Sequence, residues 1–399
     1  MLGLLLLSKD FRIFISSPIR SENAVRINSL DVPEFKLIIR PEVEKKFDLI
    51  YSHYTEDFFG KDFQKFVDFL DLNNNWEKAQ LTYLNQTYDV KIKLHGKTPT
   101  QHVEGNHYSL GVKLLNGAQI NEVSRFNLIV FWRIRYKYDV LKYLANNLDL
   151  NMTENELVKI QINDRTKKLY FFEYRMNSDF LKKTNRQNFV ALKHKSDHSL
   201  VYTGGDIEKW NVKLIKAIGK LEVNDSLKAI IYDNYSKLNN AIYEENTKQV
   251  ISHFDLEYLT KIQAFRYVFA DDGHGFGFEN LLILFNLSNG KFYPFVHRDN
   301  TQYTLSESEL SNGFNGENIG TYSPLFGTLA KSDLLTSKTE NYLNEILSEK
   351  RLESEVIDSI IEEYNSYYYS SSIKQFLGMQ APHSSCQNIK TLKKHFLLK

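Results

Sequence analysis

The sequence predicts an α+β protein with strands concentrated in the first half of the chain and helices in the second half. Before about residue 174, several short segments alternate apolar and polar residues, which is the period of a half-buried strand. From about residue 206 onward, apolar residues recur every three or four positions, which is the period of an amphipathic helix. The change of period predicts a β-rich lobe followed by a helical lobe.

The composition indicates a well-packed globular protein. The 399 residues are 42% hydrophobic and 25% charged, with 27 Phe, 24 Tyr and only 7 Pro. This length can bury a large core, and these fractions argue against a disordered or linker-rich chain. The net charge of +1 does not indicate nucleic-acid binding, so we expect no nucleic-acid partner.

The cysteine count and the N-terminal segment give little information about the cellular compartment. Cys386 is the single cysteine, which excludes an intramolecular disulfide and a cysteine zinc site. The apolar start MLGLLLL is too short to span a bilayer. It is either the remnant of a signal or anchor segment or an ordinary buried strand, and membrane association is expected only through such an anchor.

Individual elements follow from the same periods. We expect a strand and a helix opened by Pro41 within 34–52, and a hairpin over 80–96 turning at Asn85–Gln86. Further strands are predicted at 108–115, 126–131, 157–162, 168–173, 281–285 and 292–296. Helices are predicted at 134–148, 210–218, 227–238, 254–269 with Asp255 as its cap, and 340–366. A frayed basic tail ends the chain.

The strongest candidate for a chemical site is the segment 269–300. Asp272 and Asn280 precede the first strand of a predicted hairpin, and Asp299 and Asn300 follow the second. Such an arrangement would gather the carboxylate and amide oxygens that Mg²⁺ takes beside nucleotide phosphates. The alternative is a plain polar turn, because Asp, Gly and Asn are the commonest turn residues.

Other known motifs fail. His297–Arg298–Asp299–Asn300 imitates the H-R-D loop of ordinary protein kinases, but the later asparagine, the D-F-G and the glycine-rich loop are missing. No P-loop, H-E-x-x-H or G-x-S-x-G occurs. Paired carboxylates would also suit a glycosidase, but the sequence does not fix their separation.

The order of features over about residues 85–360 resembles the CotH kinase family, atypical protein kinases of the spore-coat protein H type. The resemblance is carried by VKIKLHG at 90–96, YSLGVKL at 108–114, FNLI at 126–129, the strands 160–164 and 169–173, Asp272–Gly273–His274 with Asn280–Leu281, and Arg298–Asp299–Asn300. It implies a highly modified kinase-like two-lobed fold, with a β-rich N-terminal lobe and a mainly helical C-terminal lobe that carries the hairpin. The domain would span 34–366, changing lobe near residue 200, between an N-terminal segment 1–33 and a polar tail 367–399.

The resemblance also implies roles and partners. ATP and Mg²⁺ or Mn²⁺ would be the cofactors, and a surface or coat protein would be the substrate. Asp272 corresponds to the catalytic carboxylate, and the metal ligands would be Asp299, Asn280 and Asn300. The nucleotide site would comprise Lys113 (or Lys97) on phosphate, Glu173 paired with that lysine, and His95 where the family has arginine. The compartment would be the cell envelope, the exterior or the spore surface, with the cytoplasm as the alternative.

Two departures from the family pattern leave a second function open. His95 replaces an arginine, and one acid of the family's D-x-D element is missing beside Asp299. Loss of a carboxylate weakens metal binding. The alternative to an active kinase is therefore a degenerate pseudokinase that serves as a surface or coat binding protein.

Overall fold

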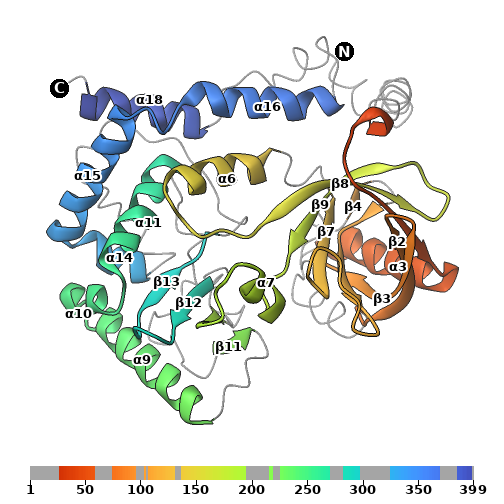
Figure 1. The fold of residues 1–399 in the computed structure, drawn as a ribbon, viewed down its shortest axis with the longest axis horizontal. Coiled ribbons are helices and arrows are strands. Elements are labelled where there is room, and N and C mark those ends of the chain that lie inside the picture. Colours follow the sequence, from red (N-terminus) through yellow and green to blue (C-terminus); the bar gives the residue numbers. More distant parts are fainter. Residues whose placement is uncertain are drawn as a thin grey trace. The chain divides into compact units, whose positions relative to one another are not determined.

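The computed structural model describes residues 27–58, 74–95, 103–104, 107–130, 136–194, 215–218, 225–269, 282–296, 324–368 and 384–397. The chain divides into two compact units (Figure 1). The barrel unit comprises Met1–Tyr136, Glu154–Arg175 and Glu362–Gln380. The helical unit comprises Lys137–Thr153, Met176–Ile361 and Ala381–Lys399. Each unit is therefore built from separate stretches of the chain.

The barrel unit contains a closed seven-stranded barrel. Its strands, in spatial order, are β1 (Glu34–Ile39), β2 (Glu77–Tyr83), β3 (Gln86–Leu94), β6 (Leu110–Leu114), β7 (Arg125–Val130), β9 (Lys168–Tyr174) and β8 (Asn155–Ile162). All neighbouring pairs are antiparallel except β1 and β8, which pair in parallel and close the barrel. A two-residue pair, β4 (Val103–Glu104) with β5 (His107–Tyr108), stands beside it.

Alternate residues of these strands fill the barrel interior. Phe126 stacks on Phe172 with ring centroids 4.3 Å apart, and Phe35 lies 5.9 Å from Phe172. At one end, Tyr174 donates a 2.6 Å hydrogen bond to Glu156, and burial raises the pKa of the Tyr174 hydroxyl. The high aromatic content of the sequence is thus used where large rings must fill a closed space.

The predicted kinase-like two-lobed fold is wrong. The strands expected to form a separate β-rich lobe close on themselves, because β1 and β8 pair although more than one hundred residues separate them in sequence. The described part of the chain also places a second sheet among the helices. The hairpin signals were local and correct, but no local signal reports the pairing that closes the barrel.

Helix α3 (Pro41–Phe58) follows β1 directly. Its first residue is proline, which lacks a backbone N–H. This costs no hydrogen bond, because the first N–H groups of a helix have no acceptor within the helix. Phe47 is fully buried and meets the Tyr108 ring edge-on at 5.6 Å. Asn163, in the turn between β8 and β9, accepts from the Ile39 N–H at 2.8 Å and donates to Glu44 at 3.1 Å. The predicted helix opened by Pro41 is confirmed and anchored to the barrel.

The helical unit combines a bundle with a small sheet (Figure 1). The sheet has the order β11 (Ile215–Ile218), β10 (Phe189–His194), β12 (Leu282–Asn286), β13 (Phe292–Pro294). The described helices are α6 (Lys137–Asn147), α7 (Ser178–Lys183), α9 (Asp225–Tyr243), α10 (Thr247–Ser252), α11 (Leu256–Phe269), α14 (Pro324–Ala330), α15 (Asp333–Ser348), α16 (Ser354–Tyr368) and α18 (Ser384–Leu397). The part of α16 from Glu362 onward belongs to the barrel unit. None of the helices in the described segments is long and apolar enough to cross a membrane.

Helix α11 is the centre of this unit and packs against α15 and α18. Asp255 accepts from the Tyr258 N–H at 2.8 Å, which confirms the predicted cap. Arg266 is 1% exposed and lies 4.1 Å from the centre of the Phe326 ring. On the same helix, the Val268 carbonyl accepts from Asn388 of α18 at 3.1 Å. A buried guanidinium thus stacks on an aromatic ring in this core.

Three predicted elements differ from the structure. Residues 215–218 form strand β11 rather than the end of a helix, because they pair with β10. The helix predicted over 340–366 is two helices, α15 and α16, separated after Glu349, which caps α15. The C-terminal segment contains α18, whose Cys386, Ile389 and Leu392 are fully buried, so 384–397 is an ordered helix rather than a frayed tail.

The barrel core gives a stability prediction. Phe172→Ala should cost about 3–5 kcal/mol, because it removes a fully buried ring that three other rings contact. Ile38→Ala, on the outside of β1 where Ile38 is 42% exposed, should cost less than about 1 kcal/mol. Urea unfolding followed by circular dichroism measures both variants. Similar losses in the two variants would contradict the interior packing.

His107 gives a pH prediction. Its ring is 3% exposed, and burial lowers its pKa to about 4, with Lys168 acting in the same direction against a hydrogen bond with the Thr166 backbone. The folded pKa lies below the unfolded value of 6.5, so the neutral His107 ring contributes to the free energy of unfolding. This contribution to stability is fully present above pH 6.5 and is lost as the pH falls toward 4. The loss approaches roughly 3 kcal/mol.

His107→Phe should remove this component, so its stability should fall less between pH 6.5 and 4 than that of the wild type. Chemical denaturation at a series of pH values measures the difference. Parallel pH profiles for the two proteins would show that His107 does not titrate on unfolding.

Candidate functional site

The strand register sorts the outward side chains of the barrel into rows that run across the strands. On β6, β7 and the second half of β3, from residue 90 onward, the residues with even numbers are buried inside and those with odd numbers point outward. Directly opposite residues on paired strands lie about 5 Å apart. Two adjacent rows on this outer face are polar, and they hold Lys113 and Glu173, two of the three described residues that the sequence assigned to the nucleotide.

The first of these, the basic row, contains one positive residue from each of four paired strands. Lys78 on β2 is opposite Lys91 on β3, Lys91 is opposite Lys113 on β6, and Lys113 is opposite Arg125 on β7. Arg175 follows β9 and continues the β7–β9 register opposite Arg125. Like charges directly opposite one another are destabilising in a sheet. The barrel therefore carries a repulsive arrangement that packing does not require.

The second, the polar row, is one step along the strands and is largely buried. It contains Lys93, Gly111, Asn127, Glu173 and Asn155, each opposite the next in the strand register. Glu173 is 3% exposed, and its carboxylate accepts from Asn127 Nδ2 at 2.8 Å. A buried carboxylate needs such partners to remain charged away from water.

Two amide atoms in the polar row keep unused hydrogen-bonding capacity. Asn127 Oδ1 and Asn155 Nδ2 are buried and have no hydrogen-bond partner among the described residues. A Cβ at Gly111 would lie 3.7 Å from Asn127 Oδ1, so this oxygen faces the glycine. Buried polar atoms are normally satisfied, and an acceptor and a donor left open in one row indicate a place that a ligand or water can complete.

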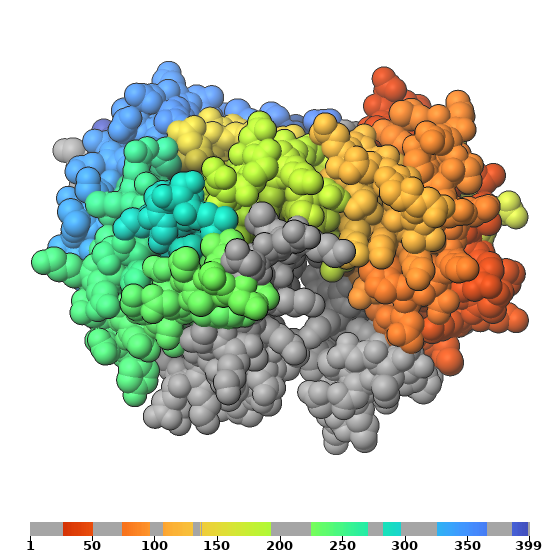
Figure 2. Space-filling view, turned by 60° about the horizontal axis from the view of Figure 1, so that its bottom comes forward, coloured from red at the N-terminus to blue at the C-terminus, as the bar shows by residue number. Residues whose placement is uncertain are grey.

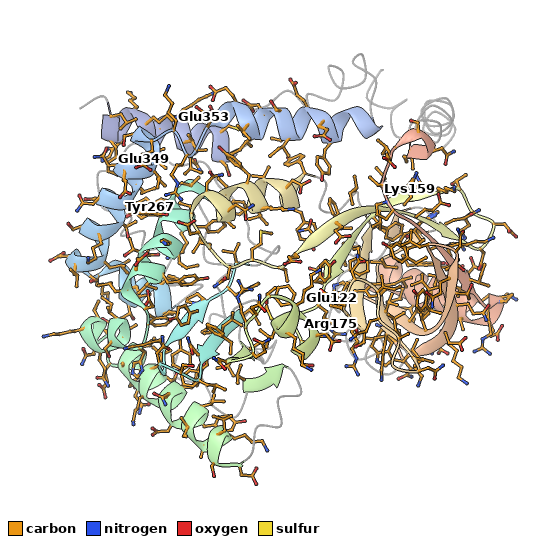
Figure 3. The ribbon with its side chains drawn as sticks, viewed as in Figure 1. Glu122, Lys159, Arg175, Tyr267, Glu349 and Glu353 are labelled. Atoms are coloured by element: carbon orange, nitrogen blue, oxygen red, sulfur yellow. The ribbon has the colours of Figure 1, made fainter. Side chains whose placement is uncertain are left out.

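Arg175 joins the two rows electrostatically. Burial lowers the pKa of its guanidinium, the charge of Arg125 lowers it further, and the charge of Glu173 raises it. Figure 3 labels Arg175 where β9 ends at the edge of the barrel. Lys159, labelled elsewhere on the barrel, is instead fixed by a 2.6 Å hydrogen bond to the Leu30 carbonyl. Arg125 and Arg175 are therefore positive charges near Glu173, whereas Lys159 is held at another part of the barrel.

The predicted nucleotide residues that are described lie on this one face, but not in direct contact. Lys113 and Glu173 are separated by β7 and form no salt bridge with each other. Asn127, not the lysine, binds the carboxylate. His95 follows β3 on the same face, and its N–H donates to the Ser109 carbonyl at 2.8 Å. It stands about 13 Å along the strands from Lys113, or four residues.

The remaining predicted site residues lie outside the described residues: Asp272, Asn280, Asp299, Asn300 and the alternative Lys97. The hairpin that they flank is confirmed as β12 and β13, joined by a turn in which Gly290 has φ +66°. In the described part of the chain, no three His, Cys, Asp or Glu side chains gather as a metal site.

Sequence reasoning missed Asn127, Arg125 and Arg175. Asn127 interrupts an otherwise apolar run, Phe126 to Val130, at an outward position. Arg175 follows a strand whose other outward residues include Glu173. Polar residues at alternate positions of apolar strands can be recognised in the sequence. Only the register between β7 and β9 shows that Asn127 and Glu173 are opposite each other.

No family model and no curated protein matches the chain. The resemblance to the CotH kinases therefore remains a prediction from the sequence motifs.

The repulsion in the basic row can be measured. Lys113→Gln removes the charge between Lys91 and Arg125 and should stabilise the protein by about 0.5–1 kcal/mol at low salt. The gain should shrink in 1 M salt, where the screening length is about 3 Å. Lys36→Gln, on β1 opposite uncharged Thr82, is the control. Destabilisation of Lys113→Gln at low salt would contradict a repulsive row.

Proposed function

We propose that this protein transfers the γ-phosphoryl group of ATP to hydroxyl groups of a protein substrate. The observation that carries the proposal is the row of Lys113, Arg125 and Arg175, which adjoins the row that holds the buried carboxylate of Glu173. Phosphoryl transfer depends on positioned positive charges more than on covalent chemistry by the enzyme. The resemblance to the CotH kinases supports the same reaction from the sequence.

In this proposal the basic residues bind the phosphates, and Glu173 positions the basic residues. Arginine offers a planar fork that matches phosphate oxygens, and lysine adds a point charge. The charge of Glu173, which is held by Asn127, opposes the lowering of the Arg175 pKa by burial. Asn155 Nδ2 supplies a further donor that a phosphate oxygen or a hydroxyl would satisfy.

The metal and the base are assigned from the sequence. Mg²⁺ or Mn²⁺, when bound, would neutralise phosphate charge, with Asp299, Asn280 and Asn300 as its ligands. Within the two described rows Glu173 is the single carboxylate, so the described residues fit a role beside the phosphates rather than a complete metal site. Asp272 is the proposed acceptor for the proton of the attacking hydroxyl.

A second candidate is a binding protein on the same scaffold that does not turn over. The missing acid beside Asp299 and the histidine at position 95 favour it. The two candidates share nucleotide or phosphate binding at the basic row and differ only in phosphoryl transfer. Binding and turnover must therefore be measured separately.

A thermal-shift titration with ATP and Mn²⁺ tests the binding step. The wild type should be stabilised by mass action, by about 2.7 kcal/mol at one hundred times the dissociation constant. Lys113→Ala and Arg125→Ala should each weaken binding about 10- to 100-fold, because each removes a charge-assisted hydrogen bond. Asp299→Ala should abolish the dependence on Mn²⁺, and Lys36→Ala should change nothing.

Transfer of labelled phosphate then tests turnover, with Asp272→Asn expected to abolish it. No thermal shift at millimolar ATP would refute nucleotide binding. A shift insensitive to Lys113 and Arg125 would place the phosphates elsewhere. A shift that depends on them, without transfer to any hydroxyl, would establish the binding protein instead of the kinase.

A further inference from the structure

The basic row extends beyond the residues assigned to the phosphates. Lys91 on β3 and Lys78 on β2 continue it over two more strands. Lys78 is exposed and Lys91 is partly exposed. In Figure 2, the orange residues 74–95 adjoin the lighter orange residues 107–130 on one face of the barrel unit. These two lysines are thus a surface feature that the proposed nucleotide site does not use.

Two other lysines of the barrel unit pair with carboxylates, whereas Lys78 and Lys91 have no salt-bridge partner among the described residues. Lys46 pairs with Glu77 at 2.6 Å, and Lys167 pairs with Glu34 at 2.7 Å. Among the described residues, neither Lys78 nor Lys91 lies within 4.0 Å of a carboxylate oxygen. Asp89 is the closest acidic residue in the register, one row away and opposite Gln80. The two lysines are therefore available to an external anion.

The spacing of Lys78 and Lys91 suits two acidic side chains on one face of an extended chain. The two lysines are directly opposite each other on neighbouring strands, which lie about 4.8 Å apart. An extended peptide places side chains of one face about 6.7 Å apart. Two acidic residues separated by one residue would therefore reach both lysines, and the flexible lysine stems would absorb the mismatch.

We propose that Lys78 and Lys91 bind acidic side chains of an extended protein substrate whose hydroxyl group is to be phosphorylated. The term substrate rests on the proposed function, but the binding itself requires no turnover. Kinases commonly select substrates by complementary charge patterns. Here the row would place the acidic stretch next to Lys113 and Arg125, where the phosphates are proposed to bind.

The row fits a peptide better than single-stranded nucleic acid. Nucleic-acid sites interleave their positive charges with aromatic rings on which bases stack. The basic row contains no aromatic residue. Trp76, beside it on the same face, already has the Lys93 ammonium 5.3 Å from its ring centre. A free stacking platform is therefore missing from the described part of this face.

Fluorescence anisotropy with a labelled eight-residue peptide of alternating Glu and Ser tests the inference on the full chain without nucleotide. Lys78→Glu/Lys91→Glu should weaken peptide binding at least 10-fold, and Lys78→Gln/Lys91→Gln should weaken it by a smaller factor. Lys36→Glu/Lys45→Glu, which makes the same change in net charge elsewhere on the barrel unit, should change it less than twofold. Binding by the wild type should fall steeply with salt.

Several results would overturn the proposal. These are no binding of millimolar peptide at low salt, equal losses in the row and control variants, or tighter binding of a labelled oligothymidylate that the row variant loses. Circular dichroism confirms that each variant folds. If the thermal shift with ATP depends on Lys113 but the peptide does not bind, this inference fails and the kinase proposal stands. Peptide binding without any ATP shift would refute the nucleotide site alone.

Discussion

The parallel pairing of β1 with β8 determines the rest of the barrel unit. It joins residues 34–37 to residues 159–162 and consumes the last two free strand edges. Once the sheet is closed, every strand residue must point either into a filled interior or outward, with no intermediate choice. The single parallel pair in the described barrel thus converts a set of hairpins into a structure with a strict inside and outside.

The aromatic interior explains why the polar side chains gather where they do. Phe35, Phe126 and Phe172 fill the space between the strands, so no charged side chain of β3, β6 or β7 can turn inward. The positive residues of neighbouring strands must share the outer face, and the register places them opposite each other. The packing of the barrel interior explains why polar side chains point outward. It does not explain why every residue of the basic row is positive.

Each of the two outer rows contains an electrostatically unfavourable arrangement: a buried negative charge in the polar row and adjacent positive charges in the basic row. Glu173 is a buried carboxylate that depends on Asn127 and on neighbouring positive charge. The basic row instead keeps like charges adjacent, which lowers stability. An anion bound as proposed would gain both new contacts and relief of this repulsion. Such a trade between stability and binding is common at functional surfaces.

The sequence by itself determined the local elements: the hairpin at 80–96, the strand pair around 163–167, the capped helix α11 and the hairpin of β12 and β13. It also selected Lys113 and Glu173. Only the tertiary structure decided that the strands close into a barrel, that 215–218 pairs as a strand, and that Asn127 rather than Lys113 binds Glu173. The physical reason is range, because period and caps act over a few residues, whereas the closing pair and the rows depend on registers between segments far apart in the chain.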